Sequence, residues 1–453
     1  MRRTEELWSN MRKPKKHLSC DSLILGLKSL FKKIKDPRNK KEQECKYKLE
    51  DIGLSVFACM FFQDPSLLAF QRRMQDKGEK SNFNTIFKVE DIPESTQLRN
   101  VLDKIPSVSI QPFFKEIFRR FQRGKHLDQF QFLRSKYLVS LDATQYYSSK
   151  KISCQHCLTK KNKKDGAISY SHQALQAALV HPDKKQVIPL IAEDIKNEDG
   201  KNKQDCENNA AKRLIPKLRK QHSQLDIILL GDSLYSKHSI VEVTKEKRMN
   251  YIFTAKPADH KYMFSWIEEN EELQKIIEID DRDRQYVYKW VNNVPLCSRD
   301  DSFNVNFFQL EIYSAPDKTT GERKCTYRSS WVTDLTIREK SVKRFTKAAR
   351  CRWKIENECF NNLKNQGYHL EHNYGHGSEY LSFNIYLLTL LAFLFHQIFE
   401  LTDGLYSKAR SKWPLRELWE RIRGFVCSFI FESWYQLMKH CLDPPKIHSP
   451  INI

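Results

Sequence analysis

The spacing of apolar residues changes near residue 136 and separates two kinds of segment. Before it, apolar residues recur at helical spacing, for example over residues 23–30 and 54–60. Ser95 and Thr96 follow Pro93 and precede another such run, and their hydroxyl groups suit the start of a helix. Residues 1–135 are therefore predicted to form a helical region.

After residue 136 the apolar runs become short and rich in Val, Ile and Leu, which is typical of buried strands. A helix is predicted over residues 204–221, after the third of these strands, and another before the fifth. Strand, strand, strand, helix, strand, helix, strand is the order of the ribonuclease H-like α/β fold, a mixed sheet enclosed by helices. The predicted strands are residues 137–144, 172–180, 186–191, 225–230 and 251–255.

A second strand-rich stretch without helices follows, and the pattern then returns to helices over residues 341–365, 379–401 and 414–440. We interpret the stretch as a β-subdomain inserted into the α/β core, with strands over residues 285–291, 304–314 and 325–333. The predicted division is a helical N-terminal DNA-binding region (1–135), a first part of the core (136–281), the insertion (282–335), a second part of the core (336–402) and a C-terminal helical region (403–453).

The net charge of the chain indicates which kind of molecule it binds. The chain has 77 Lys and Arg against 56 Asp and Glu, a formal net charge of +21 that is spread along its length. Such an excess favours a polyanion, and nucleic acid is the simplest one.

Cysteine content and hydropathy bear on the compartment. Twelve cysteines without a signal-peptide pattern predict a reducing compartment and free thiols. The longest apolar stretch, residues 381–399, contains Ser382, Asn384 and His396, so we expect a buried core helix and no membrane span. With a DNA partner, the expected location is cytoplasmic and nucleoid-associated.

Three carboxylates are placed for phosphodiester chemistry. Asp142 follows the buried run Leu-Val-Ser-Leu, and Asp232 follows Ile-Leu-Leu-Gly. An acid at the end of an apolar strand is costly to bury unless a metal or a partner compensates it. Phosphodiester transfer uses two hard cations about 3.5 to 4 Å apart, held by carboxylates from different elements. Glu356, on a later predicted helix, is the third candidate.

The directions in which side chains point from the helix predicted over residues 341–365 decide whether Glu356 or Glu358 is the third candidate carboxylate. On an α-helix Trp353, Phe360 and Leu363 share one face, which we expect to be buried. Glu356 and Glu358 are two residues apart and point about 200° away from each other, so only one can face the aspartates. We choose Glu356, with Glu358 as the alternative.

Residues 95–400 resemble the DDE transposases of bacterial insertion sequences, especially those with a β-subdomain inserted between the second Asp and the Glu. Asp142, Asp232 and the Arg352-x-x-x-Glu356 helix carry the resemblance. The phrases at residues 195–201, 205–210 and 365–377 add to it.

The family signature is Tyr, two residues, Arg, three residues, Glu, six residues, Lys. Arg352 and Glu356 fit it. Ala349 stands at the Tyr position, and Leu363 stands at the Lys position, with Lys364 one residue later.

The resemblance implies a metal-dependent enzyme that cleaves transposon ends and transfers a strand into target DNA. It implies two Mg²⁺ or Mn²⁺ ions held by Asp142, Asp232 and Glu356, and Arg352 and Lys364 as phosphate-positioning residues. The DNA partners would be the terminal inverted repeats and the target, and a homodimer would pair the two ends. Two alternatives stay open, a domesticated transposase that binds DNA without catalysis and a ribonuclease H-type nuclease acting on hybrids.

Two further groups have alternative interpretations. Trp290, between Tyr286 and Val291 of the predicted insertion, either stacks on a displaced base or packs inside the subdomain. Cys154 and Cys157 have half of a zinc-site spacing and form either a structural zinc site or free loop thiols.

Candidates to complete such a zinc site are His156, His172 and Cys206, which are close in sequence or could be brought close by the fold. His369, His372 and His376 are spaced too irregularly for a ligand set and are interpreted as structural or near DNA.

Overall fold

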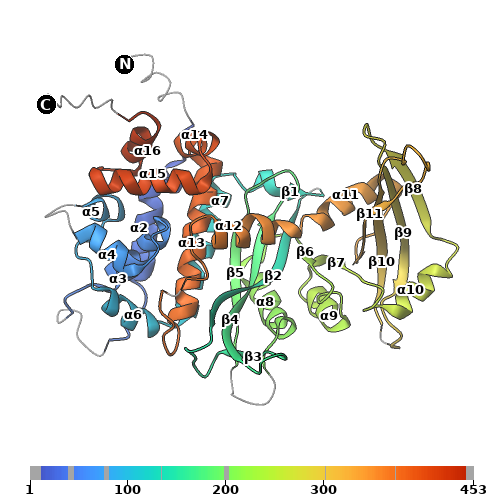
Figure 1. Cartoon of the computed structure of the whole chain (residues 1–453), viewed down its shortest axis with the longest axis horizontal. Coiled ribbons are helices and arrows are strands. Elements are labelled where there is room, and N and C mark those ends of the chain that lie inside the picture. The colour runs from blue at the N-terminus through green and yellow to red at the C-terminus, as the bar shows by residue number, and fades with distance from the viewer. Residues whose placement is uncertain are drawn as a thin grey trace.

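The computed structural model of the protein describes residues 12–38, 45–75, 81–133, 135–197, 204–300, 302–372 and 374–444. The molecule is elongated, with a helical part at one end, a central α/β part and a strand-rich part at the other end (Figure 1).

The helical part combines segments from both ends of the chain. α3, buried along its whole length, packs against α2 and against α13, which is also almost fully buried. The N-terminal elements are η1 (Lys16–Leu18), α2 (Cys20–Phe31), α3 (Leu49–Phe61), α4 (Leu67–Gln75), α5 (Asn82–Phe87), α6 (Ser95–Asp103), η3 (Ser107–Ser109), α7 (Gln111–Arg123) and η4 (Asp128–Phe130). The C-terminal ones are α13 (Leu381–Thr402), α14 (Gly404–Lys412), α15 (Leu415–Ser428) and α16 (Trp434–Leu442).

α13 is the described helix that is long and apolar enough to cross a membrane, and 94% of its most apolar window is buried in the fold. This confirms the predicted core helix.

The helix predicted over residues 414–440 is two helices, α15 and α16. Asn82 of α5 causes the break, because its side-chain amide donates to the carbonyls of Val426 and Phe429 and accepts from the backbone N–H of Phe431. The Ser433 hydroxyl then caps α16 by accepting from the backbone N–H of Gln436. A tertiary contact from the N-terminal region therefore sets this helix boundary.

The central sheet has the strand order β5-β4-β2-β6-β7. β4 is antiparallel to β2 and β5, whereas β2, β6 and β7 run parallel to one another. This confirms the mixed α/β class and the predicted succession of strands and helices. The elements are β1 (Gln131–Phe132), β2 (Lys136–Ser149), β3 (Leu158–Lys161), β4 (Ile168–Val180), β5 (Ile188–Ile195), α8 (Glu207–Gln221), β6 (Ile227–Gly231), α9 (His238–Glu246) and β7 (Asn250–Thr254).

The strands of the predicted insertion extend this same sheet. β11 pairs antiparallel with the outer edge of β7, through Trp331↔Thr254 to Thr333↔Ile252, so its backbone satisfies an edge that would otherwise be open. The stretch also begins earlier than residue 282, with β8. The elements that follow β7 are α10 (Lys261–Glu268), β8 (Gln274–Ile279), β9 (Gln285–Pro295), β10 (Asn304–Tyr313) and β11 (Cys325–Thr333).

The helix predicted over residues 341–365 consists of three pieces. They are α11 (Glu339–Arg350), a π-helical turn η5 (Ile355–Phe360) and α12 (Asn361–Asn365). These pieces run from the strand-rich part across the central sheet towards the helical part (Figure 1).

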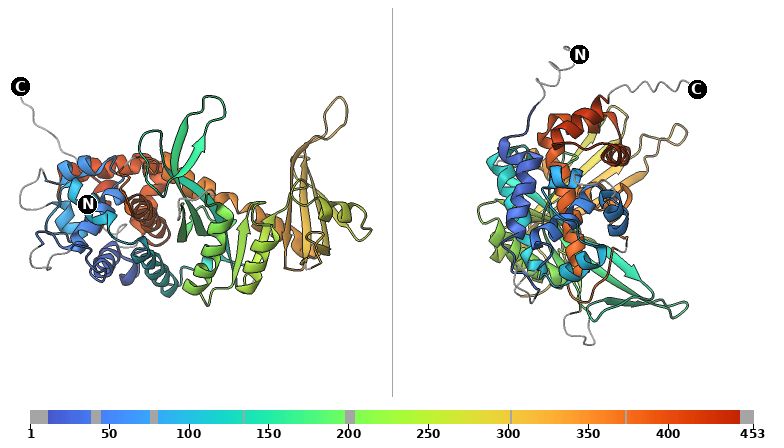
Figure 2. Two further views of the ribbon diagram at one scale, coloured as in Figure 1. Left: turned by 90° about the horizontal axis from the view of Figure 1, so that it is seen from below. Right: turned by 90° about the vertical axis from the view of Figure 1, so that its left-hand side faces the viewer.

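A β-ribbon projects from the central sheet (Figure 2). It is formed by the last part of β2, by β3 and by the first part of β4, which pair with one another over Ser149↔Tyr170 and Leu158↔Ser171. We call residues 149–170 the ribbon.

Candidate active site

Asp142 and Asp232 lie beside each other where β6 ends against β2. β2 and β6 are parallel and paired as far as Ser140↔Leu230. Asp142 comes two residues after Ser140 in β2, and Asp232 comes two residues after Leu230, directly beyond the end of β6. Both side chains are partly buried, so the two strands deliver two carboxylates to one place.

Glu356 reaches the same place from η5. The buried Arg352 guanidinium donates from Nη1 to Glu356 Oε1 at 3.0 Å, and the same nitrogen lies 3.6 Å from Asp142 Oδ2. The Ser140 hydroxyl donates to the backbone carbonyl of Arg352 at 3.1 Å and ties the start of this turn to β2. In the described part of the chain Glu358 forms no ion pair with a basic side chain.

The pKa of Asp142 is strongly perturbed. Burial and the nearby Glu356 carboxylate raise the pKa of Asp142 to about 8, against the opposing effect of Arg352. Two carboxylates this close share a proton unless a cation neutralises them. Strongly perturbed acids of this kind are typical of functional sites.

A fourth acid, Glu207, stands in the first turn of α8 and accepts a hydrogen bond from the Tyr235 hydroxyl at 2.6 Å. Burial raises the pKa of Glu207, and the charge of Asp232 adds to the rise. The Tyr235 ring lies against Gly231, where any Cβ would approach it to 2.6 Å. Glu207 is not distinguished as a site residue by the sequence, because an acid in the first turn of a helix is also the ordinary partner of the helix dipole.

The prediction that Trp353 anchors a buried face is wrong. Its side chain is 50% exposed and stacks on the Arg352 guanidinium, 4.0 Å from ring centroid to Cζ. Phe360 and Leu363 are buried as expected. The physical reason is that α11 ends at Arg350 and η5 makes wider turns than an α-helix, so residues before and after it no longer keep α-helical phase.

The same π-turn changes the position of Lys364. A π-turn accommodates about one residue more than an α-turn. Lys364 lies eight residues beyond Glu356. Because η5 accommodates about one extra residue, this separation corresponds to seven residues on a regular α-helix, which places Lys364 within about 20° of the face of Glu356. Lys364 is partly buried and pairs with Glu371, Nζ to Oε1 at 2.8 Å.

Trp290 lies inside the strand-rich part. It is 6% exposed, in β9, directly opposite Phe308 of β10. Of its two interpretations the structure favours packing, because a base could stack on Trp290 only if the side chain were exposed.

Cys154 and Cys157 are brought together with His172 and His376, and the four potential ligand atoms lie within 4.8 Å of one another. The group could hold a metal ion. The interpretation of His376 as a residue outside any ligand set is therefore corrected. Cys206, a candidate by sequence, is exposed and outside the group.

Residues 198–394 match the family model of the Transposase DDE domain. No curated protein matches the chain. Such a domain implies a ribonuclease H-like fold, a phosphoryl-transfer enzyme that binds DNA, and the use of divalent metals. Asp232 and Glu356 fall within the match and Asp142 precedes it. Of the phrases that carried the resemblance, residues 198–201 and Asn373 lie outside the described residues.

Proposed function

We propose that this chain is a DNA transposase of the bacterial insertion-sequence kind. It hydrolyses a phosphodiester bond at each transposon end and joins the freed 3′-hydroxyl to target DNA. The observation that supports this most is that Asp142 and Glu356 both contact Arg352, while Asp232 follows the neighbouring strand β6 beside Asp142. Asp232 and Glu356 lie within the matched domain, and Asp142 precedes it.

The donor set fits hard divalent cations. Asp142, Asp232 and Glu356 offer carboxylate oxygens, the ligands that Mg²⁺ and Mn²⁺ prefer, and the Glu356 side chain is 37% exposed and so accessible to solvent and DNA. These three residues would hold two ions. Bound ions supply Lewis-acid stabilisation of the attacking and leaving oxygens.

The residues of the chain itself position the reacting groups. Arg352 fixes the Glu356 carboxylate beside Asp142 and brings a positive charge to the phosphate. Lys364, returned to the face of Glu356 by η5, is the second phosphate-positioning residue, and DNA would compete with Glu371 for its ammonium group.

The partners and the assembly follow from the same proposal. Terminal inverted repeats and target DNA account for the net charge of +21. Joining two ends in one reaction requires two sites, so we propose a homodimer on paired ends, located in the cytoplasm with the nucleoid.

The proposal is tested with Asp142→Asn and Asp232→Asn on a duplex that carries the inverted repeats flanking the gene. Each substitution removes a charge that holds the cations, and cleavage and strand transfer should fall at least about a hundredfold, equal to about 2.7 kcal/mol in the barrier. DNA affinity should change by less than about twofold, because the basic surface remains.

Asp226→Asn is the matched control, since Asp226 precedes the opposite end of β6 and pairs with Lys136 on the surface. Its activity should equal that of the parent. Strand transfer by Asp142→Asn or Asp232→Asn would contradict the assignment of these aspartates as residues that hold the cations. Cleavage of RNA–DNA hybrids without strand transfer would instead favour the ribonuclease H-type nuclease.

A further inference from the structure

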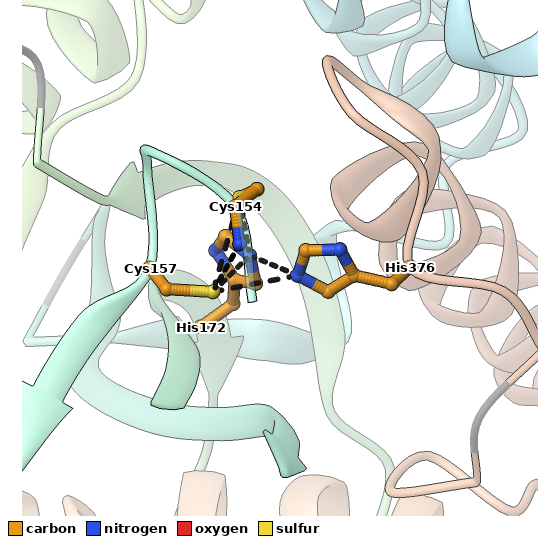
Figure 3. A group of neighbouring side chains, drawn as sticks. All are labelled: Cys154, Cys157, His172 and His376. Atoms are coloured by element: carbon orange, nitrogen blue, oxygen red, sulfur yellow. Dashed lines mark hydrogen bonds between the residues drawn. The ribbon is translucent and has the colours of Figure 1, made fainter. Parts of the chain in front are cut away.

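Four side chains from three separate segments, two of them in the ribbon, point at one another (Figure 3). Cys154 and Cys157 lie in the turn between β2 and β3, His172 lies in β4, and His376 lies in the loop before α13. His172 and His376 are 204 residues apart in the sequence, yet their Nε2 atoms are 3.1 Å apart.

Five of the six distances among the four atoms are close to those of a tetrahedral metal site, and the sixth, from Cys154 Sγ to His376 Nε2, is within 4.8 Å. Zinc bonds of about 2.3 Å to sulfur and about 2.0 to 2.1 Å to nitrogen imply edges of about 3.8 Å between sulfurs, about 3.6 Å between sulfur and nitrogen and about 3.3 Å between nitrogens. The two Sγ atoms are 3.8 Å apart. His172 Nε2 lies 3.6 Å from Cys154 Sγ and 3.4 Å from Cys157 Sγ, and His376 Nε2 lies 3.4 Å from Cys157 Sγ.

A disulfide or a plain hydrogen-bond network explains the group less well. A disulfide needs sulfurs about 2.05 Å apart. His376 Nδ1 donates to the Gly377 carbonyl at 2.8 Å, because a carbonyl oxygen can only accept. In the neutral His376 ring the lone pair is then on the other nitrogen, Nε2, which faces the thiols. A carbonyl that holds the second ring nitrogen is the usual outer contact of a metal-binding histidine.

The surrounding backbone is shaped to present these ligands. Gly375 and Gly377 flank His376 with φ of +135° and +69°, in the region that favours glycine. A Cβ at Gly377 would approach Asp103 Oδ1 to 2.3 Å. In the cysteine turn, the backbone N–H of Cys154 donates to Cys157 Sγ at 3.4 Å, a contact that stabilises a thiolate.

Neighbouring residues of the same types are directed elsewhere. His156, between the two cysteines, uses Nδ1 to donate to the Asn197 carbonyl at 3.0 Å.

Aromatic rings cover the group of four ligands, with Tyr147 4.5 Å from the ring of His376 and Tyr146 stacked 5.9 Å from that of His172. Such a covered, closed set of four ligands is typical of structural zinc.

We propose that Cys154, Cys157, His172 and His376 bind one structural Zn²⁺ that fastens the base of the ribbon to the loop between α12 and α13. Two thiolates and two imidazoles select Zn²⁺ over Mg²⁺, which prefers oxygen. All four positions are filled by protein, so the ion takes no part in chemistry. The site is independent of the proposed transposase activity.

The first test is the metal content of the purified full-length chain, measured by inductively coupled plasma mass spectrometry. We expect about one zinc per chain in the parent and less than about 0.1 in Cys157→Ser and His376→Gln, because loss of one ligand leaves an incomplete tetrahedron. His156→Gln and Cys206→Ser are matched controls, one in the same turn and one outside the group, and both should keep the zinc.

Cobalt gives a readout that does not depend on any variant folding. Co²⁺ exchanged into the parent should show the intense visible bands of tetrahedral coordination together with thiolate-to-metal charge transfer. Asp142→Asn should keep these bands while it loses DNA cleavage, which separates this site from the carboxylates. A parent that neither carries zinc nor shows the cobalt bands overturns the proposal, as does loss of metal in both controls.

Discussion

Arg352 connects two carboxylates that come from different elements. Its guanidinium is 8% exposed and contacts Glu356 of η5 and Asp142 of β2. A buried arginine is destabilising unless carboxylates compensate it, and buried carboxylates need the same compensation. The three side chains are therefore mutually dependent, and the Glu356 carboxylate is held beside Asp142 before DNA arrives.

At this scale we predict that Glu356→Gln lowers Mg²⁺-dependent cleavage of a DNA end at least about a hundredfold, about 2.7 kcal/mol, because one of three cation-holding charges is lost. Glu358→Gln should lower it by less than about threefold, since the Glu358 side chain makes no ion pair in the described structure. Single-turnover cleavage by both purified variants is the measurement. An inactive Glu358→Gln beside an active Glu356→Gln would reverse the assignment.

At the scale of elements, the ribbon extends β2 past the carboxylates. Asp142 lies in the middle of β2, and the seven residues from it to Ser149 span roughly 20 Å of strand. The ribbon carries exposed lysines at 150, 151, 160, 161, 163 and 164. This places positive charge beyond Asp142 and Asp232, where a DNA backbone could be held.

We predict that replacing Lys160, Lys161 and Lys163 together with Gln weakens binding of all duplex sequences alike. Each lost phosphate contact should reduce the slope of log affinity against log salt by about 0.9, and so by up to about 2.7 for the three. The control replaces Lys275, Lys318 and Lys324, which are exposed in the strand-rich part, with the same change of charge. Equal losses in the two triple variants would mean that only net charge matters.

At the scale of the molecule, the two ends of the chain form one helical body rather than two regions. The Phe61 ring of α3 lies 5.4 Å from Trp419 of α15 and 5.5 Å from Trp434 of α16, between ring centroids. It also contacts Phe395 of α13. The domain division at residues 135 and 403 stays a prediction, and these contacts show that both helical regions share a core.

We predict that Phe61→Ala lowers the free energy of unfolding of this body by about 3 to 5 kcal/mol, because a large buried ring is removed from close packing. Denaturant unfolding measures the loss, and hydrogen exchange should rise in both α3 and α15. Leu25→Ala, at a residue of α2 that is 50% exposed, should change the stability by less than about 1 kcal/mol. Faster exchange confined to α3 would argue against a shared core.

Local pattern was enough to predict the strand that ends just before Asp232 and the buried run that leads to Asp142, because an apolar run followed by an acid is a property of a few consecutive residues. The expectation that the first strand ends near Asp142 was wrong, since pairing with β4 continues β2 to Ser149. The order of strands and helices was likewise readable, because each element is defined by its own spacing of apolar residues. The matched Transposase DDE domain agrees with the class of function that the family resemblance implies.

Only the tertiary structure decided the features that depend on residues far apart in the chain. His376 joins the cysteine turn across more than 200 residues, β11 extends the sheet at β7, and Asn82 divides the C-terminal helices. The π-turn at η5, which exposes Trp353 and shifts Lys364, could not be predicted from the sequence either, because a periodicity of 3.6 residues assumes an unbroken α-helix. Sequence determines local preference, whereas these outcomes are set by which distant groups meet and satisfy one another.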